Sequence, residues 1–361
     1  MIRFEVVLEQ HEAKRLLSAA LADGPRHAYL LHGPPGVGKR PLALLFAAEL
    51  LGDHARVERR THPDLYVLEP VGDQIRIDDI RELRRDLHMR PFEASRRVYV
   101  VFAADTMNED AADALLKDLE EPPGYAVILL IADDLGPLPE TIRSRCQLVP
   151  FRRLSERAVH DAVRARAPEL SEDEVTTIAR VAGGRLDRAE RLLDAAAARR
   201  RETLLGVARS VYLDPGFDAH EAAQLLLEGI AERGAEAKEK AEETVEVLEL
   251  TGREAEQRVR RSQRGAERDE LLATLEELEW WYRDLVVVAA GAEAAVVHVD
   301  RRDDLREDAT RERSLGAERA CEIVRAAWRE AEELQLSVPL ALEALLVRLR
   351  RELAGRVLSG A

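Results

Sequence analysis

The glycine-rich segment at residues 33–39 constrains the fold of this chain more than any other feature. It reads Gly-Pro-Pro-Gly-Val-Gly-Lys and completes the G-x-x-x-x-G-K pattern of a phosphate-binding loop, or P-loop. In such a loop, backbone N–H groups surround phosphate oxygens at a helix N-terminus, and the lysine reaches the β and γ phosphates. The motif joins a strand to a helix and therefore predicts an α/β nucleotide-binding fold. The candidate nucleotide contacts are Gly33, Gly36, Gly38 and Lys39.

The residues that would support ATP hydrolysis are missing. The position after the P-loop lysine normally carries a hydroxyl that holds Mg²⁺, and here it is Arg40. A later strand should end in Asp-Glu to support the metal and the attacking water, but Phe102 and Ala103 occupy those positions. Asp105 lies further along, where we expect its side chain to point away from the site. The sequence thus predicts a nucleotide-binding fold that does not hydrolyse ATP, although weak ATP or ADP binding is still allowed.

Composition and targeting signals limit the classes of protein that fit. The chain has 361 residues, of which 46% are hydrophobic, enough for roughly two to three domains. Its net charge of −15 argues against a protein whose whole surface binds nucleic acid. Cys146 and Cys321 form no C-x-x-C pair, so no disulfide framework or zinc site is indicated. The N-terminus lacks a signal-peptide core, and no apolar run approaches the roughly 20 residues of a membrane span, so we expect a cytoplasmic protein.

Residues 1–153 alternate short apolar runs with helical patterns. The runs are uniformly apolar, as expected for strands buried on both faces of a parallel sheet. Asn108 is a good N-cap for a helix that must stop by Glu121, because two prolines follow. This part is predicted to be a doubly wound α/β domain. Its five predicted strands are residues 28–32, 65–68, 98–102, 127–131 and 147–151.

The pattern becomes wholly helical from residue 154. Ser155 can cap a first helix, residues 171–174 read Ser-Glu-Asp-Glu and form a capping box for a second, and a third is predicted over residues 186–198. These three helices make a small lid over residues 154–200. Long helices are predicted for the remainder.

Two features of the C-terminal part have ordinary structural explanations. The charge-rich stretch at residues 232–270 is more typical of a solvated helix face or mobile hairpin than of a binding site. Trp280, Trp281 and Leu285 lie at helical spacing and are predicted to pack in a core.

Several segments resemble a known family. Residues 114–123, 127–132 and 141–146 are similar to the signature of bacterial clamp-loader subunits of the AAA+ class. Residues 61–66 (Thr-His-Pro-Asp-Leu-Tyr) and 281–285 (Trp-Tyr-Arg-Asp-Leu) are similar to the delta-prime family of these subunits. The likeness is specific in the α/β domain and looser toward the C-terminus.

The resemblance implies a role without independent ATPase activity. Delta-prime subunits complete a hetero-oligomeric ring with gamma/tau and delta subunits in the DNA polymerase III holoenzyme. The ring loads the sliding clamp onto primer-template DNA during replication. The resemblance further implies an AAA+ P-loop domain over residues 1–153, a helical lid over 154–200 and an oligomerising helical collar over 201–361. No cofactor is required for such a role.

Two arginines acquire candidate roles from the same resemblance. Arg145, in a Ser-Arg-Cys motif, maps onto the family's arginine finger, which acts in trans on the γ-phosphate of a neighbouring subunit. The alternative is an arginine that pairs within its own domain. Arg188 resembles the sensor-2 arginine of the nucleotide site.

The chain departs from many relatives in the segment at residues 51–61. Those relatives carry a four-cysteine zinc module there, but this segment contains no cysteine, so no metal is expected. His54 and His62 alone cannot supply a closed zinc site and are predicted to be surface or packing residues.

Two other functions compete with the non-hydrolysing one. An active gamma/tau-like loader ATPase would need Ser or Thr at position 40 and carboxylates at positions 102 and 103, which are absent. A stand-alone DNA-binding accessory protein would need a basic surface. The candidate track of Arg81, Arg84, Arg85 and Arg90 is interrupted by acidic residues, so a solvated helix face is favoured over phosphate contact.

Overall fold

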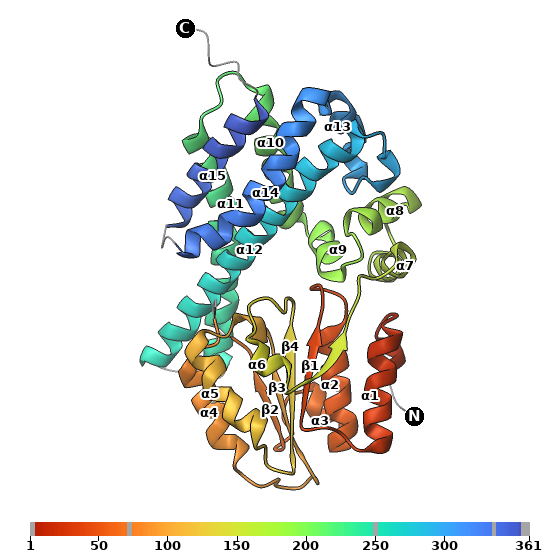
Figure 1. Ribbon diagram of the computed structural model, residues 1–361, viewed down its shortest axis with the longest axis vertical. Coiled ribbons are helices and arrows are strands. Elements are labelled where there is room, and N and C mark those ends of the chain that lie inside the picture. The colour runs from red at the N-terminus through yellow and green to blue at the C-terminus, as the bar shows by residue number, and fades with distance from the viewer. Residues whose placement is uncertain (1–3, 71–73, 248–251, 334–336, 355–361) are drawn as a thin grey trace. The chain divides into compact units, whose positions relative to one another are not determined.

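A computed structural model describes residues 4–70, 74–247, 252–333 and 337–354. The chain divides into two compact units, which are described separately (Figure 1). The first unit comprises the residues up to 162 together with 183–188, and the second comprises 163–182 together with the residues from 189 onward. The three domains expected from the sequence do not coincide with these units and stay a prediction.

The first unit is built on a five-stranded parallel sheet, as predicted. The strand order is β2-β3-β4-β1-β5, and Ala28 lies opposite Ile128 in the register of the central pair. Every residue of β3 and β4 is buried, which explains why these runs lack polar alternation. The strands are β1 (Ala28–His32), β2 (Leu65–Leu68), β3 (Arg97–Val101), β4 (Ala126–Ala132) and β5 (Gln147–Pro150).

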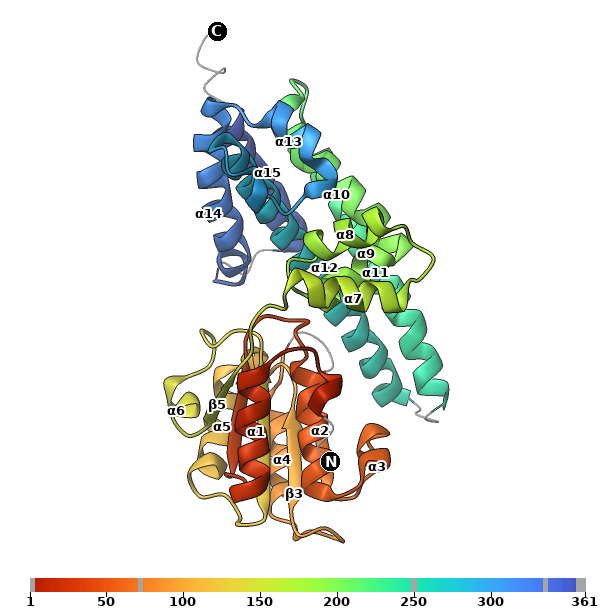
Figure 2. The ribbon, with the colours of Figure 1, turned by 90° about the vertical axis from the view of Figure 1, so that its right-hand side faces the viewer.

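Helices cover both faces of this sheet (Figures 1 and 2). Leu31 and Val100 pack in the core on one face, whereas Leu30 and Val101 pack on the other, because successive strand residues point to opposite faces. The first face carries α1 (His11–Asp23), α2 (Lys39–Leu51) and α3 (His54–Glu58), and the second carries α4 (Ile77–Leu87), α5 (Glu109–Glu120) and α6 (Glu140–Arg143). Short 3-10 turns are η1 (Phe4–Val6) and η2 (Ala104–Thr106).

Helix caps occur where the sequence predicts them. The Asn108 side chain accepts a hydrogen bond of 3.0 Å from the backbone N–H of Ala111 and so caps α5. Ser155 accepts one of 3.1 Å from the N–H of Ala158 at the start of α7 (Glu156–Arg166). The predicted Ser171 capping box is also confirmed.

The second unit contains helices and connecting loops, with no strand among its described residues. Trp281 and Leu285 are fully buried in its core, as predicted, while Trp280 is half-buried. The helices are α8 (Glu172–Val181), α10 (Ala195–Leu213), α11 (Ala219–Val247), α12 (Gly252–Ala289), α13 (Arg302–Asp308), α14 (Arg311–Glu333) and α15 (Val338–Leu353), with 3-10 turns η3 (Glu293–Ala295) and η4 (Val299–Arg301). Helices α7 and α9 (Leu186–Leu193) are divided between the units.

One predicted helix is interrupted. The continuous helix expected over residues 186–198 is wrong, because α9 ends at Leu193 and α10 begins at Ala195. The Asp194 carboxylate accepts a hydrogen bond of 2.7 Å from the N–H of Ala197 and caps the new helix.

The charge-rich stretch lies on α11 and α12, apart from residues 248–251, which fall outside the described residues. Within the described chain no helix is both long and apolar enough to cross a membrane.

Candidate functional site

The P-loop joins the end of β1 to the start of α2. Gly33, Gly36 and Gly38 have positive φ values of 135°, 68° and 99°, a region that favours glycine. A Cβ at Gly33 would collide with the carbonyl oxygen of Phe151, and one at Gly36 would collide with the carboxylate of Asp187. The predicted glycines are therefore required by the path of the loop itself.

Lys39 lies at the first turn of α2 and is 4% exposed. Its Nζ donates to the backbone carbonyl oxygens of Gly33 and Pro34. It also forms an ion pair of 2.7 Å with Oδ1 of Asp133. An ammonium has three N–H donors, so the chain itself provides an acceptor for each of them.

Three carboxylates act electrostatically on the Lys39 ammonium, and one of them, Asp133, contacts it. Burial lowers the pKa of Lys39 below its ordinary value, and Asp133, Asp105 and Asp187 oppose this shift without cancelling it. The expectation that Asp105 points away from the site is wrong, since its charge acts on the lysine. Ala103 has a left-handed backbone with φ of 51°, so the alternation of side chains along β3 does not continue to Asp105.

The positions that would hold Mg²⁺ contain a different cluster. The guanidinium of Arg40 lies 4.6 Å from the ring centre of Phe102, and that of Arg60 lies 5.8 Å from it. Both arginines pair with the carboxylate of Glu69, at 3.0 and 2.7 Å. Phe102 is completely buried. An aromatic ring, two guanidiniums and one already paired carboxylate therefore replace the hydroxyl and acidic pair of a hydrolysing site.

The start of α9 approaches the P-loop within the first unit. The backbone N–H of Leu186 donates to the carbonyl oxygen of Gly36 at 3.0 Å. Arg185 pairs with Asp187 at 2.7 Å, and Arg188, the predicted sensor-2 residue, is 7% exposed in the same turn. The structure thus brings Arg188 to the neighbourhood of the loop.

Arg145 follows α6 and is held by its own unit. Its guanidinium donates to the carbonyl oxygen of Thr141 at 2.8 Å and pairs with Glu120, the last residue of α5. The side chains of Arg145 and Glu120 are 32% and 50% exposed. The pairing that was weighed as the alternative to a finger is therefore present, in a solvent-accessible form.

The Thr-His-Pro-Asp segment has a structural role that sequence reasoning missed. The buried Asp64 carboxylate accepts hydrogen bonds from the backbone N–H groups of Phe92, Glu93 and Ala94 at 2.6, 2.9 and 2.8 Å. His62 is 3% exposed and accepts a hydrogen bond of 3.1 Å from the N–H of Asp64 at Nδ1. Burial opposes ionisation, but the three N–H groups and Arg97 outweigh it and lower the pKa of Asp64. The segment fixes the loop before β3.

The predicted packing role of His62 is thus confirmed. Among the residues that the structure describes, no group of three or more His, Cys, Asp or Glu side chains is placed to hold a metal ion.

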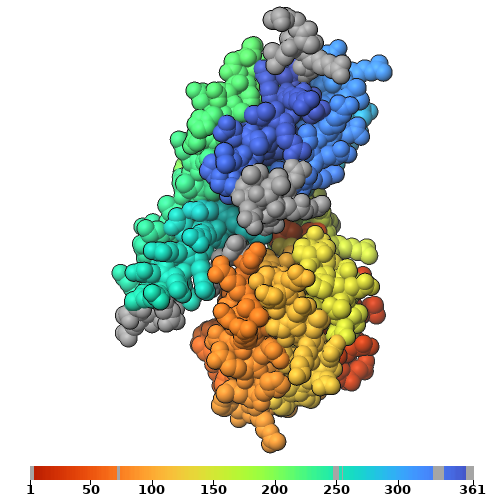
Figure 3. All heavy atoms as spheres, turned by 60° about the vertical axis from the view of Figure 1, so that its left-hand side comes forward, coloured from red at the N-terminus to blue at the C-terminus, as the bar shows by residue number. Residues whose placement is uncertain are grey.

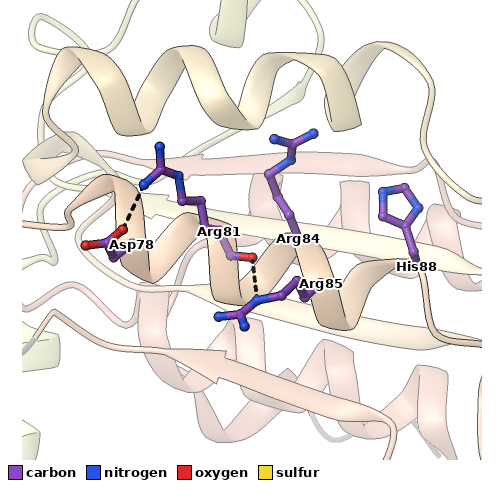
Figure 4. A pocket seen from close by; sticks show the side chains of 5 residues that line it. All are labelled: Asp78, Arg81, Arg84, Arg85 and His88. Atoms are coloured by element: carbon purple, nitrogen blue, oxygen red, sulfur yellow. Dashed lines mark hydrogen bonds and ion pairs between the residues drawn. The ribbon is translucent and has the colours of Figure 1, made fainter.

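The proposed basic track lies on α4 and the loop that follows it. Figure 3 shows the surface of α4 and α5 in orange to yellow. A hollow of about 590 Å³ lies on α4, and Figure 4 shows the five side chains that line it. Arg81 pairs with Asp78 at 3.0 Å, and Arg84 pairs with the buried Asp118 of α5. Acidic neighbours within the unit thus already engage two arginines of the track. Arg85 and Arg90 are exposed, but Arg90 does not line the hollow.

Five parallel strands with a P-loop between β1 and α2 define the first unit as a P-loop nucleotide-binding fold. Residues 9–155 match the model of a family described as "DNA polymerase III, delta subunit". The delta-prime subunit of DNA polymerase III from Bacillus subtilis is 34% identical over 166 residues, which cover 43% of this chain and 50% of that protein. The delta-prime subunit from Pseudomonas aeruginosa is 42% identical over 135 residues, which cover 33% of this chain and 41% of that protein.

Other similar proteins carry the names of tau and gamma subunits of DNA polymerase III. The tau subunit of DNA polymerase III from Bacillus subtilis is 31% identical over 212 residues, covering 54% of this chain and 38% of that protein. The crystal structure of a DNA polymerase III gamma subunit-related protein from Thermotoga maritima has a TM-score of 0.45 and 19% identity, covering 94% of this chain and 98% of that one. The chain spans half or less of the length of the three curated relatives named.

The resemblance to delta-prime-like clamp-loader subunits is therefore confirmed for residues 9–155. Residues 9–155 are thus similar to delta-prime and tau subunits of DNA polymerase III.

Proposed function

We propose that this protein is a delta-prime-type stator: a subunit that completes a clamp-loader ring without hydrolysing ATP. The observation that carries the proposal is the cluster of Arg40, Phe102, Arg60 and Glu69 at the metal side of the P-loop. Hydrolysis needs a hydroxyl and a carboxylate on Mg²⁺, and a base or positioning group for water. The Glu69 carboxylate of this cluster is already engaged by both guanidiniums and is therefore not available as a ligand for a divalent cation.

The proposed partners are gamma/tau and delta subunits, with the sliding clamp and primer-template DNA reached through the assembled ring. In this ring Arg145 would act as a finger on the γ-phosphate of the neighbouring subunit. Its exposed ion pair with Glu120 supports this role, because exposed pairs are worth only about 0–1 kcal/mol and can be exchanged for a stronger anion. A triphosphate on a neighbour is such an anion.

Purified protein tests the stator assignment. We expect no ATP hydrolysis above a mock preparation, and none after Arg40→Thr, because the carboxylates at positions 102 and 103 would still be missing. If the wild-type protein hydrolyses ATP and Lys39→Ala abolishes that activity, the active-ATPase alternative is favoured instead. Metal analysis of the same preparation should find no stoichiometric zinc.

Reconstitution with gamma/tau and delta subunits tests the finger. Arg145→Ala should preserve assembly of the ring but slow its DNA- and clamp-stimulated ATP hydrolysis. The rate should fall only in part, since the other ATP sites keep their own fingers. Removing a finger slows hydrolysis by about 10³- to 10⁵-fold at a site that depends on it fully. Arg145→Lys should not restore the rate, because lysine lacks the planar guanidinium.

A matched control is Arg152→Ala, which removes an arginine of the same unit that is 85% exposed. Wild-type hydrolysis and clamp loading by the Arg145→Ala ring would show that this arginine serves only its own domain.

A further inference from the structure

The Lys39 ammonium is engaged by the chain in a way that the stator assignment does not require. We propose that Asp133 determines whether this P-loop accepts a nucleotide, because its carboxylate occupies the ammonium at which a phosphate would bind. The ligand excluded is a nucleoside di- or triphosphate. The inference rests on the contacts of Lys39 and does not depend on the ring role.

Asp133 is the one acceptor that a ligand can displace. Two of the three acceptors of Lys39 Nζ are the carbonyl oxygens of Gly33 and Pro34, which belong to the loop backbone. The third is Oδ1 of Asp133, at 2.7 Å. A phosphate oxygen that binds Lys39 must therefore take the place of this carboxylate.

The fold places Asp133 at this position. It follows β4 directly, and β4 pairs with β1, so that Ala132 lies opposite His32 beside the P-loop. The backbone N–H groups of Asp133 and Asp134 each donate to Oδ2 of Asp105 at 3.1 Å. The segment after β4 is thus tied to η2, and the carboxylate is held beside the lysine.

Charge around the loop reinforces the exclusion. Asp105 and Asp187 also interact electrostatically with Lys39, and the Asp187 carboxylate lies against Gly36. An incoming phosphate would meet the carboxylates of Asp133 and Asp105, whereas the charge of Asp187 is paired with Arg185. Arg40 does not offset them, because its guanidinium is paired with Glu69. Negative charges beside the ammonium disfavour the binding of a further anion.

The contact differs from a permanent buried ion pair. The Asp133 side chain is 53% exposed, whereas that of Lys39 is 4% exposed. When the lysine releases it, the carboxylate can therefore return to water at little cost. Removing the charge of Asp133 should accordingly open the site without damaging the fold.

The test is nucleotide binding by the full chain with Asp133→Asn, which keeps the size of the side chain and removes its charge. Fluorescent ADP titrated without Mg²⁺ should bind about tenfold more tightly to this variant than to the wild type. Asp134→Asn is the matched control, since Asp134 is a neighbouring exposed aspartate, and it should bind as the wild type does. Adding Lys39→Ala to Asp133→Asn should remove the gain.

Three results would overturn the inference: equal affinity of the wild type and Asp133→Asn, an equal gain from Asp134→Asn, or a gain that survives loss of Lys39. Asp133→Ser, which also removes the charge, must reproduce the gain of Asp133→Asn. Failure of these titrations would leave the stator proposal untouched, because that proposal rests on Arg40 and Phe102.

Discussion

Two buried cations, one in each unit, have pKa values that are shifted in opposite directions. Lys39 in the P-loop is 4% exposed and His298 in the helical unit is fully buried. Burial lowers the pKa of Lys39 and its neighbouring carboxylates fail to restore it. Burial also opposes the charge of His298, but hydrogen bonds to Asp284 and Glu277 outweigh it and raise the pKa of this histidine.

The difference lies in the partners. Nδ1 of His298 is 2.8 Å from Asp284 and Nε2 is 3.1 Å from Glu277, so both ring nitrogens must donate and the imidazole carries a charge. Both carboxylates are buried with it. Lys39 instead has two neutral carbonyl oxygens and one half-exposed carboxylate.

The comparison separates a structural charge from a ligand-site charge. The cluster around His298 compensates its own charges and holds η4 against α12 within the second unit. The charge of Lys39 is only partly compensated, which is typical of groups that bind or react with ligands. The P-loop has kept this property although its metal-binding residues have been replaced.

Removal of the structural cation should have the largest effect on stability. His298→Leu leaves Asp284 and Glu277 each with one buried hydrogen bond unmade, although Arg283 and Arg201 stay paired with them, and we expect a loss of about 2–6 kcal/mol for the two groups. All three tryptophans belong to the second unit, so urea unfolding followed by tryptophan fluorescence reports on this unit. His220→Leu is the control, because His220 is 63% exposed. A similar loss in both variants would contradict the comparison.

The same cluster should make the second unit less stable as pH rises. Its folded state binds the His298 proton more tightly than the unfolded state does, because the folded pKa lies above the ordinary value near 6.5. The stabilisation is therefore complete below about pH 6.5 and is lost as pH rises through the folded pKa. Arg201, which also pairs with Glu277, and Arg283, which pairs with Asp284, keep their charge throughout.

Fluorescence-detected unfolding of the wild type and His298→Gln at several pH values measures this effect. The difference between the two proteins should shrink toward alkaline pH. A difference that is constant from pH 5 to 9 would mean that His298 is not charged in the folded protein.

Removal of the P-loop cation should cost less. Lys39→Met preserves most of the side-chain volume, and Asp133 can turn to water, so the loss reduces mainly to two carbonyl oxygens without a donor. We expect about 1–2 kcal/mol, measured by circular dichroism in urea. A loss of stability as large as that of His298→Leu would show that Lys39 is a structural charge, as His298 is.

The sequence predicted the framework of the P-loop well and its contacts poorly. The five strands were found to within one residue at each end, because buried parallel strands are uniformly apolar. Asp133 and Glu69 were missed, since each reaches the site only through the order of strands in the sheet, which one sequence does not state. The signal available was general: carboxyl ends of parallel strands meet at one edge, and both residues follow a strand directly.

Two other errors have local causes. Asp105 was assigned the wrong direction because the left-handed Ala103 interrupts the period of two on which that reasoning relied. The break at Asp194 was missed although an aspartate before four alanines is an ordinary N-cap signal. In both cases a single residue changes the path of the chain without changing the apolar pattern around it.

The smallest expected effect concerns the exposed pair of Arg145 and Glu120. Because both side chains remain accessible, Glu120→Gln should change stability by no more than about 0–1 kcal/mol, far less than either buried cation. If Arg145 acts in trans, the pair only holds the guanidinium until a neighbour's phosphate takes over. The reconstituted ring with Glu120→Gln should then hydrolyse ATP within about twofold of the wild type, because an exchangeable pair adds little to the bound state. If that ring instead hydrolyses ATP as slowly as the Arg145→Ala ring, Glu120 positions Arg145. The ring would then require the pair of Arg145 and Glu120 within the unit, rather than an arginine released from it.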